Sequence, residues 1–228
     1  MNTKRLGIGD RMKQYYEQVW NFKLPLRMPV IIRLDGKNFH NFTKKMNRPF
    51  DGNLIHDMAK TSKLLFEEIQ TTVFAYCQSD EISLLLHNYR KLESQALFNN
   101  EIQKLVSISA GVASSFMSRI YDKTVILDSR AFVIPETEVA NYFIWRQLDA
   151  TRNSISMLAQ SLYSHNELNK KNSKEMQDMI IARGKNWNNL QSYEKRGFCI
   201  KGEEIDWNIP IFTQDRKYIE DLLKIESE

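Results

Sequence analysis

The sequence predicts an α+β fold with a ferredoxin-like first domain, and three observations support this prediction. Patterns typical of strands and helices follow one another in the order βαββαβ between residues 29 and 135, which is the order of ferredoxin-like domains. Helical patterns dominate after Pro135. The composition is that of an ordinary globular protein, with 42% hydrophobic and 26% charged residues in a chain of 228. We therefore expect a first domain over residues 1–135 and an appended helix-rich lobe over residues 136–228.

Each expected element has its own pattern of side chains. The strands are short runs of aliphatic and β-branched residues, and the helices repeat apolar residues three or four positions apart. The βαββαβ series consists of a strand over 30–34, a helix over 54–70, strands over 73–77 and 82–87, a helix over 95–121 and a strand over 131–134. Further helices are expected over 10–21, 138–162, 173–182 and 214–225. The second and third strands form a hairpin with two acids at its tip.

Positive charge is concentrated in the first part of the chain. Residues 1–48 carry eleven Lys and Arg against three acids, a balance of +8, whereas the other residues sum to −4. A basic segment favours a polyanionic partner such as phosphate or nucleic acid, although solvated surface charge explains the same excess.

Several classes of protein do not fit this sequence. No run approaches the roughly 20 apolar residues of a membrane-spanning helix, and the N-terminus shows no pattern of a secretory signal or transit peptide. We therefore expect a cytoplasmic protein that does not use a membrane. Cys77 and Cys199 lack the spacing of a zinc site or of a disulfide framework, so we expect them to be buried free thiols.

Three carboxylates are predicted to meet at one edge of the sheet. In the βαββαβ order the first and third strands are antiparallel neighbours, so Asp35 at the end of the first should face Asp80 and Glu81 at the start of the third. Carboxylates this close repel one another unless a proton or cation lies among them. Mg²⁺ binds such oxygen ligands together with substrate phosphates, so the pattern favours two-metal nucleotidyl transfer. The alternative is that the acids belong to a plain turn and a plain hairpin tip.

The segment after Asp35 is polar and basic. Gly36 permits a phosphate to approach backbone N–H groups closely, and Lys37 supplies a cation. His40 could contact a triphosphate or a base, or could equally be a surface imidazole. The basic residues further along this segment are Lys44, Lys45 and Arg48. We expect at least one of them to contact phosphate.

Four motifs together resemble the tRNA-His guanylyltransferase superfamily, over about residues 11–200. They are Arg33-Leu-Asp-Gly-Lys-Asn-Phe-His40, Gln78-Ser-Asp-Glu81, Asp128-Ser-Arg130 and Tyr142-Phe-Ile-Trp-Arg-Gln-Leu-Asp149. The resemblance implies a polymerase-type palm that adds nucleotides to the 5′ end of tRNA in the 3′–5′ direction. It implies two Mg²⁺ ions, ATP and GTP or other nucleoside triphosphates as substrates, and a homotetramer.

The resemblance also implies roles for individual residues. Metal ligation falls on Asp35, on Asp80 and on the carbonyl of Gly36, with Glu81 as a further catalytic acid. The nucleotide-binding residues that it implies are Lys37, Asn38, Phe39, His40, Ser79 and Arg48, the last in place of a lysine. The tRNA-binding residues that it implies are Arg130, Arg146, Arg152 and Arg196. Residues 1–135 would then be the catalytic palm, and residues 136–228 the tRNA-binding lobe.

One segment departs from enzymes dedicated to histidine tRNA. Such enzymes typically carry His-Ile-Asn-Asn-Leu-Tyr-Asn after the aspartate of the fourth motif, whereas this chain reads Thr151-Arg-Asn-Ser-Ile-Ser-Met157. The segment resembles instead the branch of tRNA 5′-end repair polymerases. We therefore expect template-dependent repair of 5′-truncated tRNA, with a dedicated histidine-tRNA guanylyltransferase that adds one extra 5′ G as the alternative.

Two further alternatives come from other functional classes. A nucleotidyl cyclase uses a similar palm with paired acids and would act on its nucleotide without RNA. A non-catalytic RNA-recognition module shares the βαββαβ order but stacks bases on exposed strand aromatics. The third strand here is aliphatic over 82–86, so the sequence disfavours this module.

Overall fold

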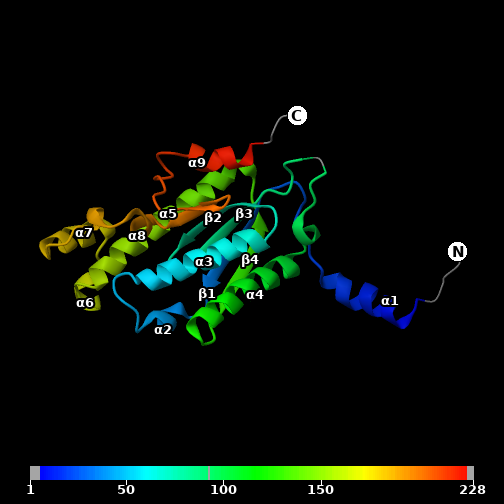
Figure 1. Cartoon of the computed structure of the whole chain (residues 1–228), viewed down its shortest axis with the longest axis horizontal. Coiled ribbons are helices and arrows are strands. Elements are labelled where there is room, and N and C mark those ends of the chain that lie inside the picture. The colour runs from blue at the N-terminus through cyan, green and yellow to red at the C-terminus, as the bar shows by residue number, and fades with distance from the viewer. Residues whose placement is uncertain (1–5, 92, 225–228) are drawn as a thin grey trace.

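The computed structural model describes residues 6–91 and 93–224, and its centre is a six-stranded sheet (Figure 1). The strands lie in the order β4-β1-β3-β2-β5-β6, and all neighbours are antiparallel. Their bounds are Val30–Gly36 for β1, Thr72–Gln78 for β2, Glu81–Leu86 for β3, Leu127–Val133 for β4, Phe198–Lys201 for β5 and Glu204–Asp206 for β6. The predicted βαββαβ order, with β1 beside β3, is confirmed.

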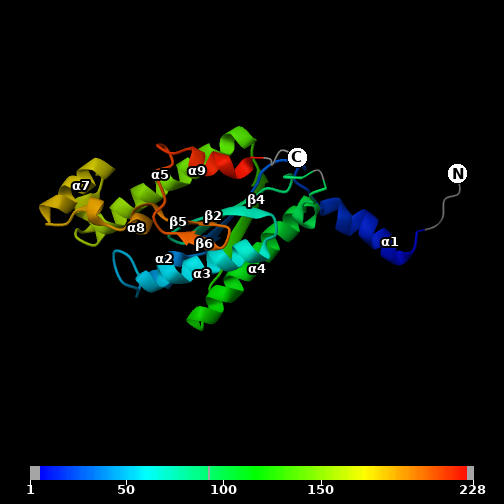
Figure 2. The ribbon, with the colours of Figure 1, turned by 45° about the horizontal axis from the view of Figure 1, so that its top comes forward.

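Helices α3 (Gly52–Glu68) and α4 (Ile102–Tyr121) cover one face of the sheet (Figure 2). Successive strand residues point to opposite faces, so Val30, Ile32 and Leu34 of β1 face these two helices and are fully buried. Each such side chain contributes about 1.5–3 kcal/mol when it leaves water. This apolar layer fixes the strands on which the site residues lie.

Helix α5 (Glu136–Gln160) covers the opposite face, and the C-terminal helix α9 (Lys217–Glu220) packs on the same side (Figure 2). Here the Phe143 ring of α5 meets the Phe74 ring of β2 at a centroid distance of 4.9 Å. The central strand β3 lies between both layers, and all of its residues are buried. Within the described residues, no helix has the length and hydropathy that crossing a bilayer requires.

The C-terminal segment returns to the sheet and adds two short strands that the expectation of a helix-rich lobe did not include. Strand β5 pairs with β2, so the sheet extends across the boundary expected at residue 135. Gly197 precedes β5 with φ +80, and a Cβ there would lie 2.3 Å from the carbonyl oxygen of Cys77. This close approach permits only glycine. As expected, Cys77 and Cys199 are buried free thiols.

The remaining helices are short, apart from α7. Their bounds are Phe39–Thr43 for α2, His165–Leu168 for α6, Ser173–Ala182 for α7 and Ser192–Arg196 for α8. The helix predicted over 173–182 is confirmed. The closing helix predicted over 214–225 is reduced to α9 and a 3₁₀ turn at Asp221–Leu223, and its last residue lies outside the described residues.

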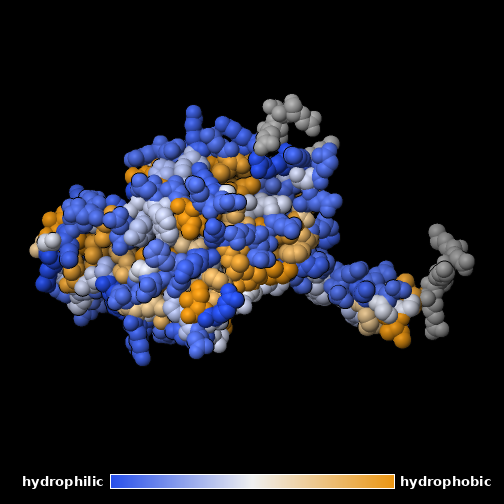
Figure 3. All heavy atoms as spheres, viewed as in Figure 1, coloured by the Kyte–Doolittle hydropathy of each residue, from blue (hydrophilic) through white to orange (hydrophobic). Residues whose placement is uncertain are grey.

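The N-terminal helix α1 (Ile8–Met12) continues as a π-helical turn and a 3₁₀ turn to Trp20 and projects from the body as an arm (Figures 1 and 2). The helix predicted over 10–21 is present as far as Trp20. Its large apolar side chains, however, are exposed. Ile8, Tyr16 and Trp20 are 73%, 64% and 64% exposed. Apolar side chains gather on the visible surface of the arm (Figure 3).

Candidate active site

The end of β1 and the turn between β2 and β3 bring two aspartates together. In the register of β1 and β3, Leu34 lies opposite Ile82, so Asp35, near the end of β1, lies toward the turn that carries Asp80. A Cβ added to Gly36 would lie 2.8 Å from Oδ2 of Asp80, which places the Asp80 carboxylate against the backbone next to Asp35. The Asp80 carboxylate thus lies beside the backbone that follows Asp35, close enough for the charge of Asp35 to raise the pKa of Asp80. The chemical roles of the two acids stay predictions.

Gly36 is required by this close packing. Its missing Cβ would lie 2.2 Å from Cδ2 of Phe39 as well as 2.8 Å from the Asp80 carboxylate. Phe39 is buried and is the first residue of α2. Any side chain at position 36 would therefore displace either the ring that anchors α2 or the carboxylate of Asp80.

The two aspartates repel each other in a partly dehydrated setting. Burial, and then the negative charge of Asp35, raise the pKa of Asp80 from 3.8 to about 6. A divalent cation would remove this conflict, because it favours ionised carboxylates. Two carboxylates beside the Gly36 backbone are hard oxygen donors of the kind that Mg²⁺ binds. The donor set therefore fits Mg²⁺.

Glu81 is held differently from Asp80, although it is the next residue. Both of its carboxylate oxygens accept hydrogen bonds of 2.7 Å from Arg146, one from Nε and one from Nη2. The two side chains are 9% and 7% exposed. The guanidinium of Arg146 is thus buried against Glu81, and the tRNA contact expected for Arg146 stays a prediction. The catalytic role expected for Glu81 also stays a prediction, and its carboxylate is directed toward α5 by these two bonds.

A cavity of about 420 Å³ opens beside the Asp80 carboxylate. It is bounded by the start of α2, by the β2–β3 turn and by the end of α5. The predicted nucleotide-binding residues among its lining are Phe39, His40, Arg48 and Ser79. The structure thus gathers four of the six expected nucleotide-binding residues around Asp80, in a space lined by both polar and apolar groups.

Lys37 and Asn38 lie elsewhere. They line a second cavity of about 360 Å³ together with Phe42 and Lys123. The Lys37 backbone N–H donates to the carbonyl oxygen of Ile126 at 2.8 Å, and Asn38 adopts a left-handed conformation with φ 56. This turn directs the chain so that residues 37–38 and residue 40 line different cavities, a separation that the sequence did not indicate.

The other three arginines expected to bind tRNA lie in different settings. Arg130 on β4 is exposed and bonds to Asp128 at 3.0 Å. Arg152 on α5 is 69% exposed and bonds to Asp149. Arg196 closes α8, where its Nε donates to Oγ of Ser192 at 3.1 Å. Arg130 and Arg152 can reach a large anionic partner, since 48% of the Arg130 side chain and 69% of the Arg152 side chain are exposed.

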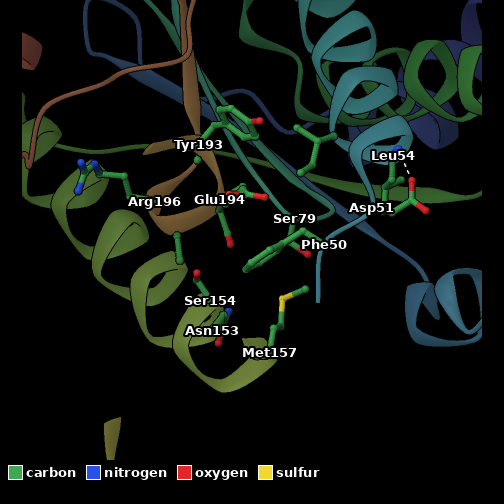
Figure 4. Close-up of a pocket in the computed structure, with 14 residues that line it drawn as sticks. Phe50, Asp51, Leu54, Ser79, Asn153, Ser154, Met157, Tyr193, Glu194 and Arg196 are labelled. Atoms are coloured by element: carbon green, nitrogen blue, oxygen red, sulfur yellow. Dashed lines mark hydrogen bonds between the residues drawn. The ribbon is translucent and has the colours of Figure 1, made fainter. Parts of the chain in front are cut away.

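A third, narrow cavity lies on the other side of Ser79 (Figure 4). In the close-up, Phe50 and Ser79 lie at its centre, with Met157 below and Tyr193 and Glu194 above. Ser79 and Met157 also line the 420 Å³ cavity. The two spaces therefore adjoin beside the β2–β3 turn.

Several site residues escaped the sequence analysis. Asp128 of β4 lies opposite Asp35 in the register of β1 and β4, whereas the sequence indicated for it only a place in the third motif. Met157 and Gln160 from the end of α5 line the cavity beside Asp80. No local pattern signals these positions, because they depend on how α5 crosses the sheet.

Comparison with known proteins identifies relatives of the whole arrangement. The family model for tRNAHis guanylyltransferase matches residues 9–139. A probable tRNA(His) guanylyltransferase of Mus musculus is 32% identical over 167 residues, which cover 66% of this chain and 54% of the mouse protein. The chain thus spans about half the length of this curated relative.

Solved structures extend the similarity over nearly the whole chain. A bacterial tRNA(His) guanylyltransferase-like protein in complex with ATP has a TM-score of 0.91 and 45% identity, and the match covers 96% of this chain and 100% of that one. A bacterial protein of the same description in complex with GTP has a TM-score of 0.86 and 44% identity, covering 95% and 98%. The chain belongs to the tRNAHis guanylyltransferase family, a family of nucleotidyltransferases.

Proposed function

We propose that this protein repairs the 5′ end of truncated tRNA by template-dependent nucleotide addition in the 3′–5′ direction. The observation that carries the proposal is the meeting of Asp35 and Asp80 beside a cavity lined by His40 and Arg48. Two carboxylates beside a cavity to which Arg48 contributes a cation suit nucleotidyl transfer from a triphosphate. Support also comes from the bacterial relatives, whose structures are complexes with ATP and GTP.

The chain's own residues would divide the work as follows. Asp35, Asp80 and the Gly36 carbonyl would hold two Mg²⁺ ions, which supply Lewis acidity to the attacking and leaving oxygens. Arg48 would neutralise triphosphate charge, and His40 would donate a ring N–H to the phosphates. Ser79 would offer its hydroxyl to the same phosphates from the turn. Exposed Arg130 and Arg152 would bind RNA phosphates, which orients the acceptor stem without reading its sequence.

The reaction would take place in two displacements. An oxygen of the tRNA 5′-monophosphate attacks the α-phosphorus of ATP, and the bond to pyrophosphate breaks, which leaves an adenylylated 5′ end. The 3′-hydroxyl oxygen of an incoming nucleoside triphosphate then attacks the 5′ phosphorus, loses its proton, and displaces AMP. The RNA is longer by one nucleotide and ends in a triphosphate. The opposite strand of the stem selects the added base by pairing.

Repair is favoured over dedicated histidine-tRNA maturation by two observations. Identity to the bacterial guanylyltransferase-like protein is 45% over nearly the whole chain, against 32% over two thirds of it for the mouse guanylyltransferase. The segment Thr151–Met157 also lacks the histidine that dedicated enzymes typically carry there. Addition of one extra 5′ G to histidine tRNA is the second candidate function, because the matching family model bears that name.

A homotetramer is part of the proposal, and the N-terminal arm supports self-association. Its apolar residues Ile8, Tyr16 and Trp20 are mostly exposed, and monomeric proteins rarely expose contiguous apolar patches of this kind. Light scattering of the purified protein should give four times the mass of the chain. The Trp20→Glu variant should give a smaller assembly, and an unchanged monomeric mass in both would contradict the tetramer.

The decisive assay supplies the protein with Mg²⁺, ATP, all four nucleoside triphosphates and a tRNA that lacks its first 5′ nucleotide. Repair predicts extension by one residue, with the base complementary to the opposite strand. A second substrate is histidine tRNA without its extra G. Extension of this RNA in preference to every truncated tRNA would favour the dedicated enzyme. Pyrophosphate release without RNA would indicate a cyclase, and no product from any RNA would contradict the proposal.

A further inference from the structure

Helix α5 is fastened to the central strand β3 by two polar contacts on one face. The Tyr142 hydroxyl lies 2.8 Å from Oγ of Ser83, and Arg146 bonds to Glu81. Positions 142 and 146 are one helical turn apart, and positions 81 and 83 share a face of the strand. The contact nearer to the site is therefore an ion pair at the residue that directly follows Asp80.

This ion pair engages both carboxylate oxygens of Glu81. Glu81 accepts both 2.7 Å bonds from the planar fork of Arg146, the geometry in which Arg and a carboxylate bind most strongly. The other hydrogen of Arg146 Nη2 is donated to Asp149 at 2.9 Å. The carboxylate of Glu81 is thereby aimed at α5 and neutralised by a buried cation.

A freed Glu81 would change the neighbouring site. Asp35 and Asp80 already repel each other, and a third negative group beside them would deepen the negative potential. Mg²⁺ in nucleotidyl transfer keeps ligand positions open for substrate phosphates, and an extra carboxylate would occupy one. Among the residues that the structure describes, no three His, Cys, Asp or Glu side chains are grouped to hold one metal ion.

We propose that Arg146 is a positioning residue that withholds Glu81 from the metal site and leaves Asp35 and Asp80 as its carboxylate ligands. This inference rests on the proposed function, because it presumes that the two aspartates bind divalent ions. Arg146 acts through Glu81 and touches neither metal nor nucleotide. The role explains why an arginine on an amphipathic helix is turned inward at this position.

The test measures binding of Mn²⁺ to the nucleotide-free protein by electron paramagnetic resonance of the free ion. Arg146→Gln should bind Mn²⁺ at least about fivefold more tightly than the wild type, because a carboxylate is released beside the site. The double variant Glu81→Gln with Arg146→Gln should stay within about twofold of the wild type, because a neutral pair replaces a neutral pair. A purely structural contact would not tighten metal binding.

Two further variants calibrate the measurement. Gln147→Leu removes another buried polar anchor of α5, whose side chain donates to the carbonyl of Pro210 at 2.9 Å and accepts from the N–H of Phe212 at 2.8 Å. It should lower the melting temperature but leave Mn²⁺ affinity within about twofold. Asp80→Asn should weaken Mn²⁺ binding at least about tenfold, which identifies the site being titrated.

The outcomes separate this inference from the function on which it rests. Mn²⁺ binding that Asp80→Asn does not change would overturn the proposed metal site and this inference with it. If Asp80→Asn weakens binding, two results overturn the role of Arg146 alone. These are weaker or unchanged binding in Arg146→Gln, and at least about tenfold weaker binding in the double variant, which would make Glu81 a ligand. If Arg146→Gln does not fold, the double variant decides.

Discussion

The two faces of the sheet show a contrast between packing and chemistry. On the face under α3 and α4, β1 presents Val30, Ile32 and Leu34, all fully buried. On the face under α5, apolar contacts give way toward the β2–β3 turn to Ser83 and then to the Glu81–Arg146 pair. The face under α3 and α4 thus stabilises the fold, whereas the face under α5 carries charged side chains at the end near the β2–β3 turn. Substitutions at the two places should therefore affect different measurements.

The largest effect is expected at the charged edge. Asp80→Asn should abolish nucleotide addition, because it removes a proposed metal ligand and no core contact. Its melting temperature in the absence of metal should equal or exceed that of the wild type, since the repulsion from Asp35 is removed. Asp215→Asn, at an exposed aspartate, is the control and should retain activity. Full activity in Asp80→Asn would contradict the assignment.

Gly36→Ala should lower both the stability of the fold and the rate of nucleotide addition. The new Cβ would lie 2.2 Å from the Phe39 ring and 2.8 Å from the Asp80 carboxylate, so overpacking should cost about 1–3 kcal/mol of unfolding free energy. Nucleotide addition should fall sharply, because Asp80 is displaced. Gly111→Ala in α4 is the matched control, since nothing lies within 4 Å of its added Cβ. Denaturant titration and the addition assay measure the two effects, and a neutral Gly36→Ala would show that the site adapts.

Leu105→Ala should act on stability alone. Leu105 is fully buried in the core near the start of α4, whereas the other end of that helix carries Tyr121, whose ring contacts Phe42 of α2. The cavity should cost about 2–5 kcal/mol of unfolding free energy. The KM for ATP should not change while the protein is folded. If Leu105→Ala raised the KM for ATP and left the unfolding free energy unchanged, the two faces of the sheet would not have separate roles.

The smallest effect is a pH dependence of stability in the absence of metal. Because the pKa of Asp80 is raised to about 6, the folded protein binds this proton more strongly than the unfolded chain, whose ordinary value is 3.8. The contribution of Asp80 to stability should therefore fall as the pH rises from about 4 to about 6. Thermal unfolding with a chelator should show this fall in the wild type relative to Asp80→Asn. If the melting temperatures of the two proteins changed with pH in parallel, the repulsion between Asp35 and Asp80 would be contradicted.

The sequence predicted those parts of the fold that local patterns determine. The bounds predicted for α7 are confirmed, and in the structure Asn172 and Glu175 form a capping box at its start. Strand β1 was recognisable from its β-branched run before Asp35-Gly36. Strand β5 was missed because its four residues are too few to show a period.

Long-range pairing explains what the sequence could not predict about the site. The meeting of Asp35 with Asp80 follows from strand order, which the pattern determines. The inward turn of Arg146 depends on Glu81, which lies 65 positions earlier. The separation of Lys37 from His40 depends on the left-handed conformation of Asn38 and on the ring of Phe39. Neither the Arg146–Glu81 contact nor the Asn38 conformation leaves a trace in the spacing of residues.

The most direct measurement of the central claim is metal rescue of a ligand variant. The Asp80→Cys protein should not extend a 5′-truncated tRNA in Mg²⁺, because a thiolate is a poor ligand for this ion. It should regain extension when Cd²⁺ is added, whereas the two native thiols, Cys77 and Cys199, are buried away from the added metal. Extension by the Asp80→Cys protein in Mg²⁺ at the wild-type rate would show that Asp80 binds no catalytic metal.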